Sequence, residues 1–388
     1  MDFTLSDEHQ LIIDAADKIA QRFDRKYWLD CAKEKRFPQE MWDELGDMGY
    51  LGITCPEAYG GAGMGMFELA LLQERLAEHG VALLYFVVNQ GIAMPCISKH
   101  GTEEQKQRWL PAMARGETKC CFAITEPNAG TNTFKIQTIG KPEGDDFVLN
   151  GSKLFISGIN QADHVLVVAR TQAYSEVGEG RKYEGITLFV VDTDSPGLTF
   201  EPMDTMLQNT EGQFFVYFNN VRVPKANVIG EVNKGLYSMF DALNPERIVV
   251  AAGAVGAGRW ALKKGVEYAN QRVIFDRPIG AYQGLQHPMA DAAALLESAW
   301  LMTQKAAWQH DRGENAGKAA NIAKYMATEA SYRAADSALQ VHGGYGFTES
   351  MDMLHSFVGA RLGKVAPINR EMTLNFIGEH ILGMPKSY

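Results

Sequence analysis

The sequence predicts an α+β protein with several domains, in which two helical regions flank a region of β-strands. Apolar residues recur every three or four positions over about residues 1–118, which is the period of an amphipathic helix. From about 119 to 232 the apolar period changes to two, as in strands, and long helical patterns return from 233 to 388. Because no helical pattern separates the predicted strands, we expect the middle domain to be an antiparallel β-barrel, or a sandwich, rather than a Rossmann unit. The last domain is predicted to be a helical bundle.

Composition excludes several classes of protein. Of the 388 residues, 46% are apolar and 22% are charged, as in ordinary globular proteins. The net charge of −10 disfavours nucleic acid and anionic membranes as partners. The five cysteines have no C-x-x-C spacing, so neither a disulfide framework nor a metal site is expected. No apolar run approaches the ~20 residues that span a bilayer, and the acidic N-terminus lacks signal-peptide character. We expect a cytoplasmic protein, with a mitochondrial matrix protein that has lost its transit peptide as the open alternative.

Helix-start signals are clear in the first region. Ser6 precedes two acidic residues, which is typical of an N-cap followed by an acidic first turn. Residues 101–106 are predicted to cap another helix, which ends near Gly116.

The middle region contains the strongest candidate for a ligand-binding turn. Residues 119–132 begin as an apolar strand that we expect to stop at Pro127, because proline has no N–H to donate to a neighbouring strand. Beyond it, Gly130 and Thr131 allow main-chain N–H groups to approach a flat ligand closely. On composition alone, a surface turn that binds nothing is the more common outcome. Further strand-like runs occupy residues 147–149, 165–168, 186–191 and 214–218.

Two further segments contain side chains that could take part in chemistry. After a predicted hairpin turn at Asn150, the residues Phe155 and Ser157 are expected to share one face of a strand; a core Phe and an incidental Ser are the alternative. Asn244 is predicted to be the N-cap of a helix whose first turn contains Glu246, where the helix dipole would favour the ionised carboxylate. Without further context, Glu246 is an ordinary capping-region charge.

Several segments resemble signatures of the acyl-CoA dehydrogenase family, and they occur in the family's order. Residues 124–132 are similar to the I-T-E-P-x-A-G-S-D pattern, with Thr131 and Asn132 in place of Ser and Asp. Residues 150–157 are similar to N-G-x-K-x-[WF]-I-[TS]. The remaining matches are P-E-x-Y-G-G at 56–61, G-T-x-x-Q-K-x-x-W-L-P at 101–111, R-x-x-F at 272–275 and Q-x-x-G-G-x-G at 340–346.

The resemblance implies a homotetrameric flavoprotein that binds FAD non-covalently. By that similarity, Phe155 would cover one face of the isoalloxazine ring and Ser157 would hydrogen-bond near the flavin N5. Arg272, Gln283 and the loop that begins at Gln340 would reach the flavin of a neighbouring subunit. The implied FAD-binding residues are Phe122, Ile124, Thr125, Gly130, Thr131, Phe155, Ser157, Arg272, Phe275, Gln283, Gln340, Val341, Gly343 and Gly344.

The family's usual catalytic base is missing from its usual place. Many members carry it in a C-terminal I-Y-E-G-T motif, where a gapless match puts Pro367, and a match with a small insertion puts Arg370. Glu371 falls on a later, non-catalytic acidic position. A second branch, which includes isovaleryl-CoA and long-chain acyl-CoA dehydrogenases, has its base in an E-R pair similar to Glu246 and Arg247. The resemblance therefore implies Glu246 as the base. The implied substrate-binding residues are Thr131, Asn244 and Arg247.

The implied reaction is α,β-dehydrogenation of an acyl-CoA, with electrons passed to an electron-transfer flavoprotein. Glu246 would take the α-proton and the flavin N5 the β-hydride. A backbone N–H of the C-terminal motif would polarise the thioester carbonyl; Pro367 has none, so Ile368 or, in the other match, Arg370 would donate. An enoyl-CoA reductase, an acyl-CoA oxidase and a non-catalytic assembly subunit are the alternatives, and the acyl chain stays undetermined.

Overall fold

The computed structural model describes residues 4–178 and 181–387, which form two compact units. Unit 1 comprises Met1–Trp28, Gly65–Ala82 and Arg247–Tyr388. Unit 2 comprises Leu29–Met64 and Leu83–Glu246. No helix in the described residues is long and apolar enough to cross a membrane.

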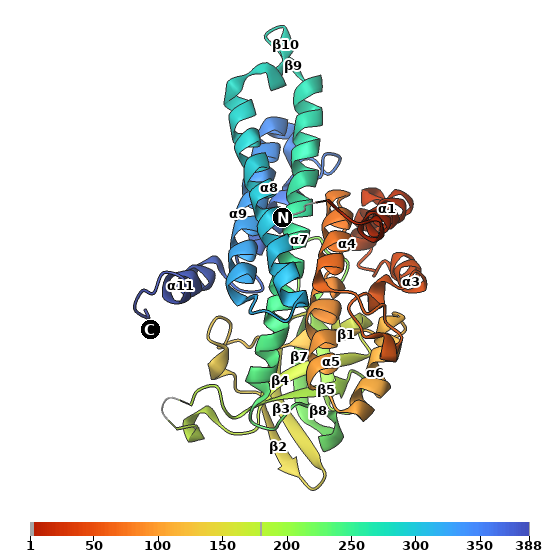
Figure 1. Cartoon of the computed structure of the whole chain (residues 1–388), viewed down its shortest axis with the longest axis vertical. Coiled ribbons are helices and arrows are strands. Elements are labelled where there is room, and N and C mark those ends of the chain that lie inside the picture. Colours follow the sequence, from red (N-terminus) through yellow and green to blue (C-terminus); the bar gives the residue numbers. More distant parts are fainter. Residues whose placement is uncertain (1–3, 179–180, 388) are drawn as a thin grey trace. The chain divides into compact units, whose positions relative to one another are not determined.

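Unit 1 is helical, and its long helices pack closely enough to exclude side chains at some positions. Figure 1 shows α8 and α9 running alongside one another and alongside α7. A Cβ atom added to Gly258 of α7 would lie 2.7 Å from Leu296 of α8 and 3.1 Å from Ser331 of α9. The small residues that the sequence places on these helices therefore bring the backbones together. The helices are α1 (Asp7–Arg22), α4 (Met66–Glu78), α8 (Gln283–Asp311), α9 (Gly317–His342), α10 (Met353–Gly363) and α11 (Arg370–His380), with the second part of α7 (Gly235–Gln271).

Unit 2 is built on a sheet of eight described strands in the order β6-β7-β3-β2-β4-β5-β8, with β1 paired to β4. They are β1 (Cys120–Ala123), β2 (Ile139–Glu143), β3 (Asp146–Ser157), β4 (His164–Arg170), β5 (Ile186–Asp192), β6 (Leu198–Pro202), β7 (Gln213–Pro224) and β8 (Val228–Ile229). The pairings of β4 with β1 and with β2 are parallel, so the prediction of a wholly antiparallel sheet is wrong there. In the described residues no pairing joins β6 to β8, and barrel closure stays a prediction. The helices of this unit are α3 (Gln39–Asp47), α5 (Met94–His100) and α6 (Glu103–Ala114), with a π-helical segment at Phe86–Ala93, and α2 (Arg25–Lys33) crosses from unit 1.

Two helices begin where capping residues in the sequence predicted them. The Ser6 side chain accepts a hydrogen bond from the backbone of His9, and Thr102 accepts one from the backbone of Gln105. The predicted N-cap at Ser6 is confirmed, and Thr102 lies within the segment 101–106 that was predicted to cap its helix. The helix that follows Thr102 ends at Ala114, close to the predicted Gly116.

Three predictions about local structure are wrong. Strand β1 ends at Ala123 rather than Pro127, where a bridge between Glu126 and Ala129 closes a turn. Asn150 and Gly151 form no hairpin, because β3 pairs with β7 on both sides of them and the register shifts at Gly151 instead.

Asn244 is not a helix N-cap either. Helix α7 begins at Gly235, so Asn244 and Glu246 lie within it, and the expected placement of Glu246 in the first turn is wrong. Leu236 and Met239 of the preceding turns are buried in the hydrophobic core of unit 2, and that packing extends the helix past Pro245.

Candidate active site

A buried ion pair organises the predicted ligand turn of unit 2. The Glu126 carboxylate accepts hydrogen bonds from the backbone N–H groups of Gln137 (2.5 Å) and Thr138 (3.0 Å) and from Lys153 Nζ (2.8 Å). Lys153, which is only 1% exposed, also donates to the Ile124 carbonyl (2.9 Å). We call the surface above this pair, formed by residues 122–131 and 155–157, the cradle.

The two charges of the pair depend on each other. Burial lowers the pKa of Lys153 to about 8, although the neighbouring Glu126 opposes that shift. Burial alone would raise the pKa of Glu126, but the attraction and hydrogen bond of Lys153 and the backbone donors hold that pKa below its ordinary value. Removing either partner would leave an uncompensated buried charge.

The cradle joins most of the predicted residues of its half of the site. Leu154 N–H donates to the Thr125 carbonyl (3.0 Å), which fixes β3 against the turn. Phe122 and Ile124 are half-buried against the core below. A Cβ atom added to Gly130 would meet no other atom within 4 Å, so the backbone is open to a ligand at that position.

An irregularity in β3 turns an aromatic ring outward beside a hydroxyl. The register of β3 against β7 shifts between Lys153 and Ile156, and Phe155 has a φ of 57° and is 57% exposed. A left-handed backbone at a bulky residue is strained, and such strain concentrates at functional sites. Ser157 is half-buried at the end of the strand. The regular alternation on which the shared strand face was predicted is interrupted here.

The predicted base lies in the same compact unit as the cradle. Glu246 is 6% exposed on α7, and Asn244 is half-buried two residues earlier. Arg247, the next residue, belongs to unit 1.

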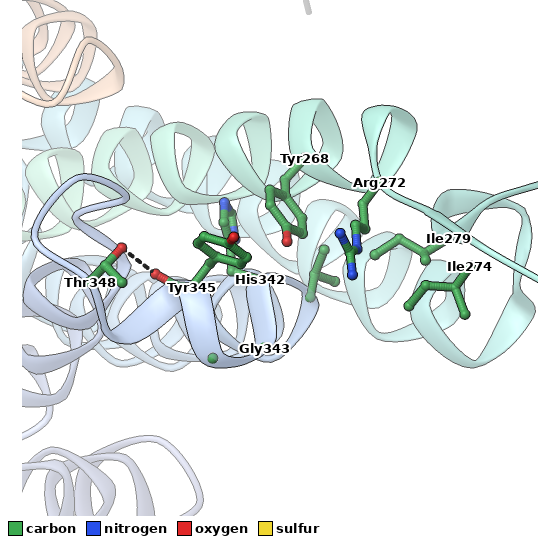
Figure 2. Close-up of a pocket in the computed structure, with 10 residues that line it drawn as sticks. Tyr268, Arg272, Ile274, Ile279, His342, Gly343, Tyr345 and Thr348 are labelled. Atoms are coloured by element: carbon green, nitrogen blue, oxygen red, sulfur yellow. Dashed lines mark hydrogen bonds between the residues drawn. The ribbon is translucent and has the colours of Figure 1, made fainter.

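A second group of predicted residues forms a pocket of about 480 Å³ in unit 1 (Figure 2). It lies between the C-terminal end of α7 and the turn after α9. Arg272, Val341, Gly343 and Gly344 line it. Gly343 has a φ of 55°, as its role in a tight turn requires, and a Cβ atom on Gly344 would meet nothing within 4 Å. The sequence therefore predicted four of the ten lining residues.

Three further predicted residues do not line this pocket. Phe275 is 86% exposed at the turn between β9 (Val273–Ile274) and β10 (Arg277–Pro278). Gln283 and Gln340 are exposed as well. Their predicted contacts with FAD are not tested by this arrangement.

The pocket has an aromatic wall that sequence reasoning missed. The His342 ring stacks on Tyr268 with 4.3 Å between centroids, and its Nδ1 contacts the Ala338 carbonyl at 2.8 Å. In Figure 2, Tyr268 and Arg272 extend from one helix toward the segment that carries His342 and Tyr345. Tyr268 lies far from the glycine turn in the sequence, so no local pattern indicated the contact.

The C-terminal segment offers no carboxylate at either aligned position. Pro367 has no charge, and the Arg370 guanidinium forms an ion pair with Glu329 at 2.9 Å. The Arg370 backbone N–H donates to the Lys364 carbonyl (3.0 Å), whereas Glu371 is exposed on α11. Neither aligned residue can remove a proton.

Comparisons with known proteins agree along the whole chain. Family descriptions match in order: "Acyl-CoA dehydrogenase, N-terminal domain" at residues 6–117, "middle domain" at 121–221 and "C-terminal domain" at 233–382. The acyl-CoA dehydrogenase FadE12 of Mycobacterium tuberculosis is 45% identical over 388 residues, which cover 100% of this chain and 99% of that protein.

Two more relatives differ in their named activities. The subunit CarC of the caffeyl-CoA reductase-Etf complex of Acetobacterium woodii is 32% identical over 88% of this chain and 89% of its own. The solved structure of butyryl-CoA dehydrogenase from Megasphaera elsdenii matches with a TM-score of 0.92 at 31% identity, over 98% of this chain and 100% of that one.

Proposed function

This chain belongs to the acyl-CoA dehydrogenase family, and we propose how its own residues perform the reaction. It is an FAD-dependent oxidoreductase that dehydrogenates an acyl-CoA thioester between its α and β carbons. Bound FAD would supply the acceptor for the β-hydride, at its N5 atom. The remaining work falls to the protein, which must orient both reactants, remove the α-proton and polarise the thioester carbonyl.

The cradle fits a flat, polar-edged ring. Phe155 presents its ring to solvent from a strained backbone, Ser157 provides a hydroxyl two residues later, and Gly130 leaves the turn open. We assign the isoalloxazine ring to this surface, with Thr125 and Thr131 at its edge. The buried Lys153–Glu126 pair holds the turn in shape without contacting the ring in this assignment.

We assign the role of catalytic base to Glu246. The main observation in support is that Glu246 is buried in the same compact unit as the cradle. The α-proton of a thioester is only weakly acidic, and a carboxylate with little access to water is a stronger base than a solvated one. The C-terminal alternatives are a proline and an arginine paired with Glu329. Asn244 and Arg247 are assigned to the substrate by family similarity.

One hydrogen bond in the structure favours one of the two backbone N–H groups that could donate to the thioester carbonyl. Of the two candidate amides, that of Arg370 already donates to the Lys364 carbonyl. We therefore propose the backbone N–H of Ile368 as the donor. Lys324 Nζ supports this loop by donating to the carbonyls of Gly363 (2.8 Å) and Ile368 (2.6 Å).

The pocket of unit 1 is assigned to the pyrophosphate end of a neighbouring subunit's FAD. A guanidinium suits phosphate because it donates two parallel hydrogen bonds, and Gly344 allows the backbone to approach closely. This assignment requires an oligomer, and we propose the homotetramer that the family resemblance implies. We retain the division into domains at 1–118, 119–232 and 233–388, and an electron-transfer flavoprotein as the acceptor, which the CarC relative's complex supports.

The reverse reaction, enoyl-CoA reduction, is the second candidate. It is favoured by the relative that is named a subunit of a caffeyl-CoA reductase. The same base would then return a proton to the α carbon while the reduced cofactor supplies hydride.

Anaerobic flavin spectroscopy tests both directions. Holoenzyme is mixed with straight, branched and aryl acyl-CoAs, and loss of the oxidised flavin absorbance is followed. Photoreduced enzyme is mixed in parallel with the matching enoyl-CoAs. Rapid bleaching by one acyl-CoA supports dehydrogenation, and rapid reoxidation by an enoyl-CoA with little bleaching supports the reductase. If no thioester changes the flavin in either direction, the proposed function is wrong.

A further inference from the structure

The side chain of Gln213 contacts the hydroxyl of Ser157 with both ends of its amide. Gln213 is the first residue of β7 and pairs directly with Ser157, the last residue of β3. Gln213 Nε2 lies 2.9 Å from Ser157 Oγ, and Gln213 Oε1 lies 3.2 Å from the same oxygen. Both residues are half-buried. No sequence pattern pointed to Gln213.

This contact offers the hydroxyl two hydrogen-bonding states. A hydroxyl has one hydrogen to donate and lone pairs that accept, whereas a primary amide has both a donor and an acceptor group. When Nε2–H donates to Oγ, the Ser157 hydrogen is free to point away from Gln213. When Ser157 donates to Oε1, an oxygen lone pair points away instead.

The backbone beneath the pair is firmly held. Gly158 N–H donates to the Gly212 carbonyl (3.3 Å), and the Tyr85 hydroxyl donates to the Gly158 carbonyl (2.6 Å). The carboxylate of Glu211 accepts from the Leu84 backbone N–H (2.5 Å), and burial raises its pKa. These hydrogen bonds fix the backbone that carries Ser157 and Gln213, and the hydroxyl hydrogen of Ser157 can turn without moving it.

We propose that Gln213 is a positioning residue that lets the Ser157 hydroxyl match both redox states of the flavin. The inference rests on the proposed function, which places the flavin N5 against Ser157. Oxidised N5 is a hydrogen-bond acceptor and needs the Ser157 hydrogen. Reduced N5 carries a hydrogen and needs the Ser157 oxygen. The amide of Gln213 completes the hydrogen bonding of Ser157 in both cases.

Loss of the Gln213 amide should destabilise the complex with reduced flavin more than the complex with oxidised flavin. When Ser157 accepts a hydrogen bond from reduced N5, its own hydroxyl hydrogen points toward Gln213. Without the Gln213 amide, that hydrogen loses its acceptor, and an unsatisfied donor is costly when it is partly buried. The variant Gln213→Met keeps the length of the side chain and removes both polar groups. We expect it to bind FAD normally, to shift the flavin midpoint potential to more negative values and to slow bleaching by roughly fivefold, the size of one hydrogen bond.

A double-mutant cycle with Ser157→Ala tests the mechanism in FAD-loaded protein. The midpoint potential is measured by photoreduction, which needs no thioester. If Gln213 acts through Ser157, Gln213→Met shifts the potential in the wild-type background and has no further effect beside Ser157→Ala. An equal shift in both backgrounds would mean a general structural role and would overturn the inference. So would a Ser157→Ala variant with an unchanged potential.

Two more variants keep the result interpretable. Gln213→Asn retains an amide but withdraws it from Ser157 by one methylene, so it is expected to shift the potential in the same direction. Gln172→Leu, in the same unit, removes an amide whose Nε2 donates to the Glu176 carbonyl (3.4 Å), and it is expected to change nothing. If the cycle behaves as predicted while no thioester changes the flavin, the proposed reaction with acyl-CoA fails, whereas the placement of the flavin against Ser157 and the role of Gln213 stand.

Discussion

The cradle of unit 2 and the pocket of unit 1 differ in the interactions that hold them in shape. The cradle rests on a buried ion pair whose carboxylate accepts from two backbone N–H groups and a lysine. The pocket is walled by the buried His342 ring and by the more exposed rings of Tyr268 and Tyr345, and within the residues that the structure describes its Arg272 makes no ion pair. One surface is held in shape by the fold, while the other keeps its charge available to a ligand.

This difference separates stability from binding. A change beneath the cradle should appear first as lost stability, because the pair is part of the core of unit 2. A change in the pocket should leave the folded protein as stable as before and weaken only its hold on FAD. The predictions below test that separation, beginning with the largest expected effect.

Lys153→Met is expected to destabilise the protein most. It leaves Glu126 buried without its cation, which should lower the free energy of unfolding by about 3–5 kcal/mol. Denaturant unfolding of the apoprotein measures this. Lys141→Met, an exposed lysine on β2, is the matched control and should cost little. If the two variants unfold alike, the ion pair does not support the cradle.

Arg272→Gln is expected to weaken FAD binding without loss of stability. Losing a charged hydrogen bond to phosphate costs about 1.5–3 kcal/mol, or roughly a 10- to 100-fold rise in the FAD dissociation constant. Equilibrium binding to the apoprotein and its melting temperature are measured together. Arg277→Gln changes an arginine at the start of β10, five residues further along the chain, which lies over the Tyr282 ring (4.5 Å), and its FAD affinity should not change. An equal loss in both variants would contradict the pocket assignment.

Gly130→Ala and Gly344→Ala compare the two regions directly. In both, the added methyl group meets no protein atom within 4 Å, so the apoprotein should melt as the wild type does. Each methyl group would occupy space assigned to FAD, at a cost of about 1–3 kcal/mol in affinity. Gly284→Ala on α8, where a Cβ atom also meets nothing, is the control. Unchanged FAD affinity in either test variant would contradict the assignment of FAD to the surface that carries that glycine.

The smallest effect is a pH dependence of the cradle. Because the pKa of Glu126 is held below its ordinary value of 4.5, its ionised form stabilises the fold at higher pH. That contribution is lost as pH falls through the lowered pKa. The stability difference between wild type and Glu126→Gln should therefore be full near neutral pH and shrink below pH 4.5. A difference that is constant with pH would show that the Glu126 charge is not what stabilises the turn.

Features that depend on neighbouring residues were predictable from the sequence. The N-caps at Ser6 and Thr102 need only residues three positions away, and the strand runs need only their own alternation. The family resemblance then located Arg272 and Gly344, which the fold brings to one pocket. These residues could be picked out because their motifs are contiguous in the chain, whereas the other six residues that line the pocket were not predicted.

Features that depend on contacts between residues far apart in the sequence could not be predicted in this way. Asn244 has the local signature of an N-cap, yet the packing of Leu236 and Met239 extends α7 through it. Asn150 has the signature of a turn, but pairing with β7 keeps β3 extended. Gln213 contacts Ser157 across 56 positions of sequence. In each case a tertiary contact outweighs or adds to the local preference.

The central claim is that Glu246 has taken over the role of the missing C-terminal base, and one comparison tests it most directly. Glu246→Gln and Glu371→Gln holoenzymes are mixed anaerobically with the acyl-CoA that reduces the wild-type flavin fastest. Glu246→Gln should retain its FAD and bleach about 10²- to 10⁴-fold more slowly, the contribution expected of a general base, while the exposed Glu371 variant bleaches as the wild type does. Wild-type bleaching by Glu246→Gln, or loss of bleaching in Glu371→Gln, would contradict the account.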